Sequence, residues 1–307
     1  MKIFRSKASA QHDPHLTALT ISQADYLREL VRQYHAGLGP QVSVSGDTLH
    51  APQGTRSLYN IAESCRRADP REWPGLVEQH FRALDGAVEA TPEGPEQILR
   101  SAYLRLVPED AFPPEAASSF SYVRRVAPGL QEALALDLPD AVRLLDDRFV
   151  AGVGLEELRA AGRANLVREP VEYDVAHGQG GAAMHIVSGE SMFVASKALV
   201  LDDLAHSVTG RQLPEEGALF VVPSRNYLVF HPLADHQVVD AVNDLAAFGL
   251  GAHQDNPGPL SPRLYWWRKG AVTSLTHIDD ATHSFSIAPP EELMAILRRL
   301  RDTGADA

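Results

Sequence analysis

Near the start of the chain, apolar residues recur with the spacing of a helix. Within residues 23–36 they occupy every third or fourth position, which predicts an amphipathic helix. Ser22 is placed to cap the free amides of its first turn, and Gly37 and Gly39 favour its end. The apolar positions of this pattern are Ala24, Leu27, Leu30, Val31, Tyr34 and Leu38.

The next segments predict one strand and two short helices. In residues 41–49, valines alternate with serines, which is typical of a strand with one buried face. Two further apolar stripes then follow helical spacing. The first stripe holds Leu58, Ile61, Ala62 and Cys65, and the second holds Trp73, Leu76, Val77, His80, Phe81 and Leu84.

From residue 171 onward, the pattern repeats an order of extended segments followed by a helix. The predicted strands cover residues 171–175, 184–187, 218–222, 227–231, 264–268, 272–277 and 284–287, and the predicted helices cover 197–208, 235–248 and 290–300. Hairpins that alternate with helices indicate an α+β protein. Its sheet is expected to be mostly antiparallel, with helices mainly on one face.

One segment is a candidate linker. Residues 86–97 mix Gly, Pro and Glu without hydrophobic periodicity, and residues 108–119 form a second proline-rich break. We therefore expect an N-terminal α/β subdomain over residues 1–88. A larger C-terminal α+β portion is expected over residues 98–307.

Composition narrows the classes of partner. The chain has 307 residues and a formal net charge of −12, with 44% hydrophobic and 22% charged residues, which are ordinary globular values. An acidic surface repels phosphate backbones and anionic lipid, so we predict neither a nucleic-acid nor a membrane partner. Cys65 cannot form an intramolecular disulfide, and residues 1–14 lack the apolar stretch of a signal peptide. We therefore expect a cytoplasmic protein.

Several signatures of cofactor-dependent enzymes are missing from the sequence. It has no G-x-x-x-x-G-K-[ST] loop, no strand followed by G-x-G-x-x-G, no H-E-x-x-H and no C-x-x-C. We accordingly predict no cofactor. Ser191 comes nearest to a nucleophile elbow, but Phe193 stands where that turn requires a small residue.

The candidate catalytic residues are His231, Asp235 and His236. They lie between an apolar hairpin and a helix, a place where α/β proteins commonly hold ligand contacts, and a histidine beside an aspartate suits general-base catalysis. The alternative is structural. Asp235 directly precedes a helical stripe, so it is also placed to cap that helix, with His236 exposed in the first turn.

A weaker alternative site is a metal centre at His277, Asp279 and His283. On a strand, His277 and Asp279 share one face, and a tight loop can bring His283 towards them, giving ligands that suit Zn, Fe or Mn. The same segment also has the residues of an ordinary hairpin turn, in which aspartates bond their own backbone. We predict no bound metal.

The candidate binding residues are the aromatic run Tyr265, Trp266 and Trp267. Alternation along a strand sends Trp266 to one face of the sheet and the other two to the opposite face. If helices cover one face only, an aromatic on the other is available to a ligand or partner. The alternative is that both faces are packed within the protein.

Some stretches resemble a known bacterial family. They are W-P-x-L-V-x-x-H-F at 73–81, V-A-P-G-L at 126–130, L-D-L-P at 136–139, A-N-L at 164–166 and A-L-F-V-V-P-S-R at 218–225. With the capped N-terminal helix, they make most of the chain similar to the YtpQ-like proteins, as an actinobacterial relative. These are cytoplasmic proteins without an assigned activity, so the resemblance implies no cofactor and no site residue.

Two functional hypotheses follow. The first is a non-enzymatic binding or regulatory protein that recognises a protein or small molecule through its C-terminal sheet and loops. The second is a hydrolase or other acid/base enzyme that uses His231, Asp235 and His236, or His277, Asp279 and His283. A structural subunit of a larger assembly remains open beside the first, and the sequence does not determine the oligomeric state.

Overall fold

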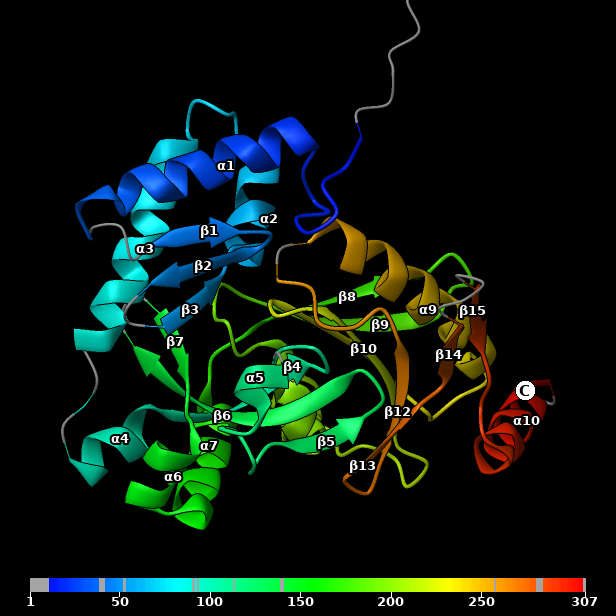
Figure 1. The fold of residues 1–307 in the computed structure, drawn as a ribbon. Coiled ribbons are helices and arrows are strands. Elements are labelled where there is room, and N and C mark those ends of the chain that lie inside the picture. Colours follow the sequence, from blue (N-terminus) through cyan, green and yellow to red (C-terminus); the bar gives the residue numbers. More distant parts are fainter. Residues whose placement is uncertain are drawn as a thin grey trace, which may run out of the picture. The chain divides into compact units, whose positions relative to one another are not determined.

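The chain divides into two compact units, Met1–Ala90 and Thr91–Ala307 (Figure 1). This division falls inside the segment 86–97 that the sequence marks as a linker. The computed structural model describes residues 11–38, 42–51, 54–89, 92, 94–112, 114–138, 141–256, 258–279 and 284–305.

The N-terminal unit begins with helix α1 (Ile21–Tyr34). Its cap is Thr20 and not Ser22, because the Thr20 side chain accepts a bond from the Gln23 amide while the Gln23 side chain accepts one from the Thr20 amide. A short 3₁₀ turn, η1 (Ala36–Leu38), follows the helix.

The rest of this unit is a small antiparallel sheet and two helices. Its strands are β1 (Ser43–Ser45), β2 (Thr48–Ala51) and β3 (Gly54–Ser57), and its helices are α2 (Tyr59–Arg67) and α3 (Trp73–Glu89). They bury one apolar core, which confirms the predicted helical stripes. Its fully enclosed members include Leu19, Leu27, Val31, Leu49, Leu58, Cys65, Trp73 and Phe81.

The C-terminal unit holds two larger sheets. The smaller one has the order β4-β6-β5, with β7 also paired to β6. Its strands are β4 (Ala102–Pro108), β5 (Arg124–Ala127), β6 (Leu130–Leu138) and β7 (Ala141–Leu144), and the neighbouring helices are α4 (Pro95–Ser101), α5 (Pro114–Ala117), α6 (Asp147–Val153) and α7 (Leu155–Arg168). Gly162 lets α7 approach β4 closely, since a Cβ there would lie 2.8 Å from the Leu104 nitrogen.

The second sheet has six antiparallel strands in the order β13-β12-β10-β11-β9-β8. They are β8 (Glu172–His177), β9 (Ala183–Ser188), β10 (Ala218–Ser224), β11 (Tyr227–Pro232), β12 (Leu264–Arg268) and β13 (Ala271–Ser274). A separate hairpin pairs β14 (Thr276–Asp279) with β15 (Ser284–Ile287). The remaining elements are η2 (Ala195–Val200), α8 (Leu201–Thr209), α9 (Val238–Asp255) and α10 (Glu291–Ala305).

Both faces of the six-stranded sheet are packed. The long helices α9 and α10 lie on the face that carries Leu219, Val221 and Trp266. The shorter η2 and α8 lie on the face of Phe220 and Tyr265, together with Ala127 and Leu130 from the smaller sheet. The predicted α+β class with antiparallel sheets is confirmed.

A helix that crosses a bilayer must be both long and apolar. Within the described ranges, no helix combines the length and the apolar character that crossing a membrane requires.

Candidate functional site

The structure separates the three candidate catalytic residues. His231 lies on β11 and is only 2% exposed, while Asp235 and His236 are exposed in the turn before α9. His231 Nδ1 is 2.8 Å from the Ala183 carbonyl, so it carries the proton and donates. His231 Nε2 is buried and has no hydrogen-bond partner among the described residues.

Asp235 does not take the capping position that the sequence offered as the alternative, because Gln237 occupies the N-cap of α9. The Asp235 carboxylate accepts a bond from the Gln237 amide at 2.9 Å. The carboxylate therefore shapes the turn that leads into the helix. It makes no hydrogen bond with the imidazole of His231 or His236.

The alternative metal residues lie on the β14–β15 hairpin or outside the description. His277 is exposed on β14, the backbone of Asp279 ends that strand, and His283 lies outside the described residues. In the part of the chain that the structure describes, no three His, Cys, Asp or Glu side chains group closely enough to hold a metal ion. His277 is exposed on the β14–β15 hairpin, whereas His231 is enclosed in the six-stranded sheet.

Two of the three aromatic candidates belong to the core of the C-terminal unit. Tyr265 is fully buried, and its hydroxyl lies 2.6 Å from Ser261 Oγ and donates to the Pro128 carbonyl at 3.0 Å. Trp266 is 5% exposed, and its Nε1 donates to the Glu216 carbonyl at 2.8 Å. Trp267 is half-buried against the same cluster as Tyr265. Of the three, Trp267 alone is partly accessible, because helices and loops cover both faces of the sheet.

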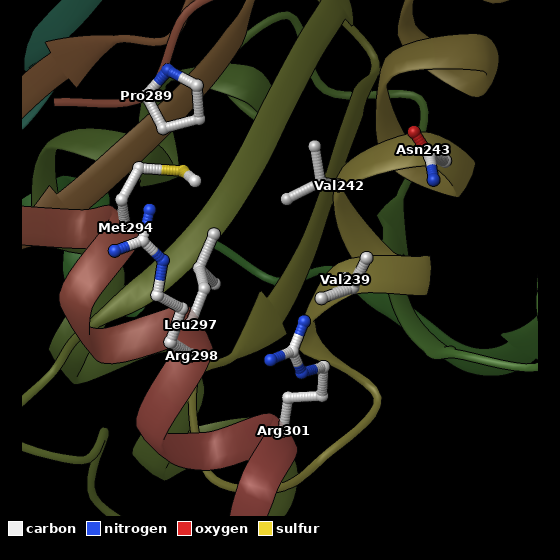
Figure 2. A pocket seen from close by; sticks show the side chains of 8 residues that line it. All are labelled: Val239, Val242, Asn243, Pro289, Met294, Leu297, Arg298 and Arg301. Carbon is white, nitrogen blue, oxygen red and sulfur yellow. The ribbon is translucent and has the colours of Figure 1, made fainter. Parts of the chain in front are cut away.

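A groove between α9 and α10 is the candidate site that the structure itself provides (Figure 2). It has a volume of ≈ 280 Å³. Side chains of α9 form one wall and those of α10 the other, and Pro289 lies just before α10. The lining residues are Val239, Val242, Asn243, Pro289, Met294, Leu297, Arg298 and Arg301.

Apolar side chains make most of this groove, and two arginines give it charge. Val239 is 41% exposed, so an apolar side chain of α9 faces solvent at the groove. Among the described residues, Arg301 pairs with its sequence neighbour Asp302 alone, at 3.0 Å. Arg298 is exposed and makes no hydrogen bond or ion pair with any residue that the structure describes. The groove therefore offers apolar surface beside the guanidinium of Arg298, which no described side chain engages, and that of Arg301, which is shared with Asp302.

Part of this site had a signal in the sequence. Arg298 and Arg301 are three residues apart, so they project from one side of a helix, as Figure 2 shows for α10. The α9 wall of the groove had no such signal, because nothing in the sequence indicates that the helix at 235–248 packs against the helix at 290–300.

Comparison with known proteins adds no further constraint on this site. No known protein family, no curated protein and no solved structure matches the chain.

Proposed function

We propose that this chain is a non-enzymatic binding protein whose C-terminal unit holds a small apolar carboxylate in the groove between α9 and α10. The observation that carries the proposal is the pairing of an apolar lining with the guanidinium group of Arg298, which has no acidic partner among the described residues. A ligand in the groove contacts both helices. Its binding can therefore change the position of α10 relative to α9, and a partner protein can recognise that change.

The size of the groove favours a small ligand. Pockets for drug-sized molecules span about 300–1,000 Å³, and this groove, at ≈ 280 Å³, lies just below that range. The apolar walls favour a hydrocarbon body, because each Å² of apolar surface removed from water contributes about 25 cal/mol.

The charge at the groove favours a carboxylate head group. Guanidinium groups bind carboxylates through two parallel N–H bonds, a geometry that an ammonium or amide group cannot supply. The chain as a whole carries a formal charge of −12, so Arg298 and Arg301 stand out locally against an acidic protein. At physiological salt their attraction acts within about 8 Å, which restricts it to a ligand already at the groove.

Lining chemistry also favours binding over catalysis at this place. Val, Pro, Met and Leu are inert, Asn243 does not titrate, and arginine stays protonated at neutral pH. None of these groups can act there as a nucleophile or as a general acid or base.

Calorimetric titration with octanoate tests the proposal. We expect octanoate to bind the wild-type protein, and 1-octanol, which has the same chain length without the charge, to bind about tenfold more weakly or worse. Arg298→Gln should weaken octanoate binding about fivefold or more, since it removes a charge-assisted hydrogen bond.

Arg299→Gln is the matched control. Arg299 is the next residue of α10, pairs with Glu216 and does not line the groove, so octanoate binding should be unchanged in this variant. Equal affinities for octanoate and octanol, or equal losses in the two arginine variants, contradict the proposal.

A further inference from the structure

A second arginine, Arg105 on β4, has an uncompensated charge in a different part of the C-terminal unit. Its guanidinium carbon lies 5.7 Å from the centre of the Phe193 ring. It makes no hydrogen bond or ion pair with any residue in the described ranges. Burial, together with a smaller effect from the nearby charge of Arg225, lowers the pKa of Arg105 to about 10. The group is therefore still a cation at neutral pH.

Arg105 is half-buried, and its guanidinium meets no acceptor of the described residues. A guanidinium has five N–H donors, and those of Arg105 are not among the fully buried atoms without a partner, so they remain accessible to a ligand from solvent. Asp137 is the acid whose charge Arg105 senses, yet its exposed carboxylate forms no ion pair with Arg105. The donors of Arg105 are thus left for an acceptor that is not part of the described chain.

The platform beneath Arg105 is well fixed. Phe193 is 1% exposed and stacks on Tyr103 with a centroid separation of 4.3 Å, and the Tyr103 hydroxyl donates to Glu169 at 2.9 Å. Held between these neighbours, the Phe193 ring can orient the guanidinium by cation–π attraction while leaving its edge donors open.

The segment that carries Phe193 is tied down on both sides. Ser196 Oγ accepts a bond from the Leu106 amide of β4 at 3.0 Å, and the Ala195 amide donates to the Arg225 carbonyl at 3.1 Å. The Asn226 side-chain amide also donates to the Gly189 carbonyl at 2.9 Å. These bonds hold Arg105 and the Arg225–Asn226 turn against one rigid loop.

We propose that Arg105 is the anchor of an anion site that binds a small oxyanion, the phosphate or carboxylate group of a ligand, with Arg225 as a second nearby cation. Arg105 supplies the donors and Phe193 fixes their direction. The elements involved are β4, the β10–β11 turn and the loop before η2, none of which lines the α9–α10 groove. A result that contradicts one of the two proposed sites therefore does not contradict the other.

Thermal unfolding in sodium phosphate tests this site, with sodium chloride of equal ionic strength as the reference. A ligand that binds only the folded state raises Tm with the logarithm of its concentration above Kd. We expect this dependence for wild-type protein in phosphate or in acetate, and the anion with the larger effect identifies the group that the site prefers.

Arg105→Met separates the rise in Tm that comes from binding at Arg105 from the rise that any protein shows in the same salt. Phosphate also stabilises proteins non-specifically by exclusion from their surface, and this part should persist in the variant while the rest is lost. Arg299→Gln, which changes neither the groove nor the surroundings of Arg105, should keep the full wild-type response. An equal anion response in wild type and Arg105→Met overturns the proposal, as does a wild-type response to neither anion beyond chloride.

Arg105→Lys and direct titration cover the case in which Arg105→Met does not fold. Lysine keeps the charge but lacks the planar fork, so Arg105→Lys should bind the preferred anion about fivefold or more weakly by calorimetry. Unchanged affinity in Arg105→Lys, or no measurable heat from either anion with wild-type protein, also overturns the proposal.

Discussion

Arg28 on α1 and Asp13 form a two-fold ion pair inside the N-terminal unit, with Arg28 Nη1 2.9 Å from Oδ2 of Asp13 and Arg28 Nη2 2.8 Å from its Oδ1. Both side chains are nearly enclosed. The Asp13 carboxylate also accepts bonds from the Leu16 and His15 amides. The segment before α1 is therefore fixed to the helix by one carboxylate.

Asp13→Asn should destabilise the protein by about 3 kcal/mol, because it removes the enclosed counter-charge of Arg28 and leaves only Asp25, whose side chain is exposed. The Arg28 side chain holds the pKa of Asp13 well below its usual range. This group's contribution is thus fully present above the unfolded pKa of about 4 and is lost as pH falls further. Urea unfolding of wild type and variant between about pH 3 and about pH 7 measures both the loss of stability and its dependence on pH. A wild-type advantage that stays constant over this interval contradicts the assignment.

Trp266 and Trp267 should differ in what they contribute to stability. Trp266→Ala removes an almost fully buried ring and its bond to the Glu216 carbonyl, so we expect a loss of about 3–5 kcal/mol in the free energy of unfolding. Trp267→Ala removes a half-buried ring, and about half of that loss is expected. Denaturant unfolding measures the free energy of unfolding of each variant. Equal losses contradict the difference in burial between Trp266 and Trp267.

The sequence predicted the local patterns well, because they depend on neighbours in the chain. The stripe Ala24, Leu27, Leu30 and Val31 is buried as its spacing indicated. The cap was wrong by two residues, since Ser22 and Thr20 are both good caps and the reciprocal bond with Gln23 decides between them.

Contacts between segments that are distant in the chain could not be predicted from the sequence pattern. Alternation placed aromatics on both faces at β12, but it did not show that α8 and η2 cover the side of Tyr265. The α9–α10 groove and the open donors of Arg105 likewise depend on which helices and loops meet. The resemblance to YtpQ-like proteins stays a prediction.

Cys65 should be unreactive in the folded protein. It is fully enclosed in the N-terminal core, and burial raises the pKa of its thiol to about 12, so almost no thiolate exists at neutral pH. A disulfide reagent at pH 8 should modify no thiol in buffer and one per chain in denaturant. Rapid modification without denaturant contradicts this packing.

His185 should make stability depend on pH near neutrality. Its ring stacks between Tyr173 and Phe230, its Nδ1 lies 2.7 Å from the Tyr173 hydroxyl, and burial lowers its pKa, with a smaller effect from His231. As pH falls through about 6.5, His185 takes up a proton in the unfolded chain while it stays neutral in the folded protein. Its contribution to stability is therefore complete above about pH 6.5 and is lost as pH falls towards the folded pKa. His185→Gln should flatten this fall without abolishing it, because burial lowers the pKa of His253 as well. Urea unfolding between about pH 5 and pH 8 measures the slope. If His185→Gln keeps the full wild-type slope while His253→Gln removes it, the pH dependence belongs to His253 and the role assigned to His185 is wrong.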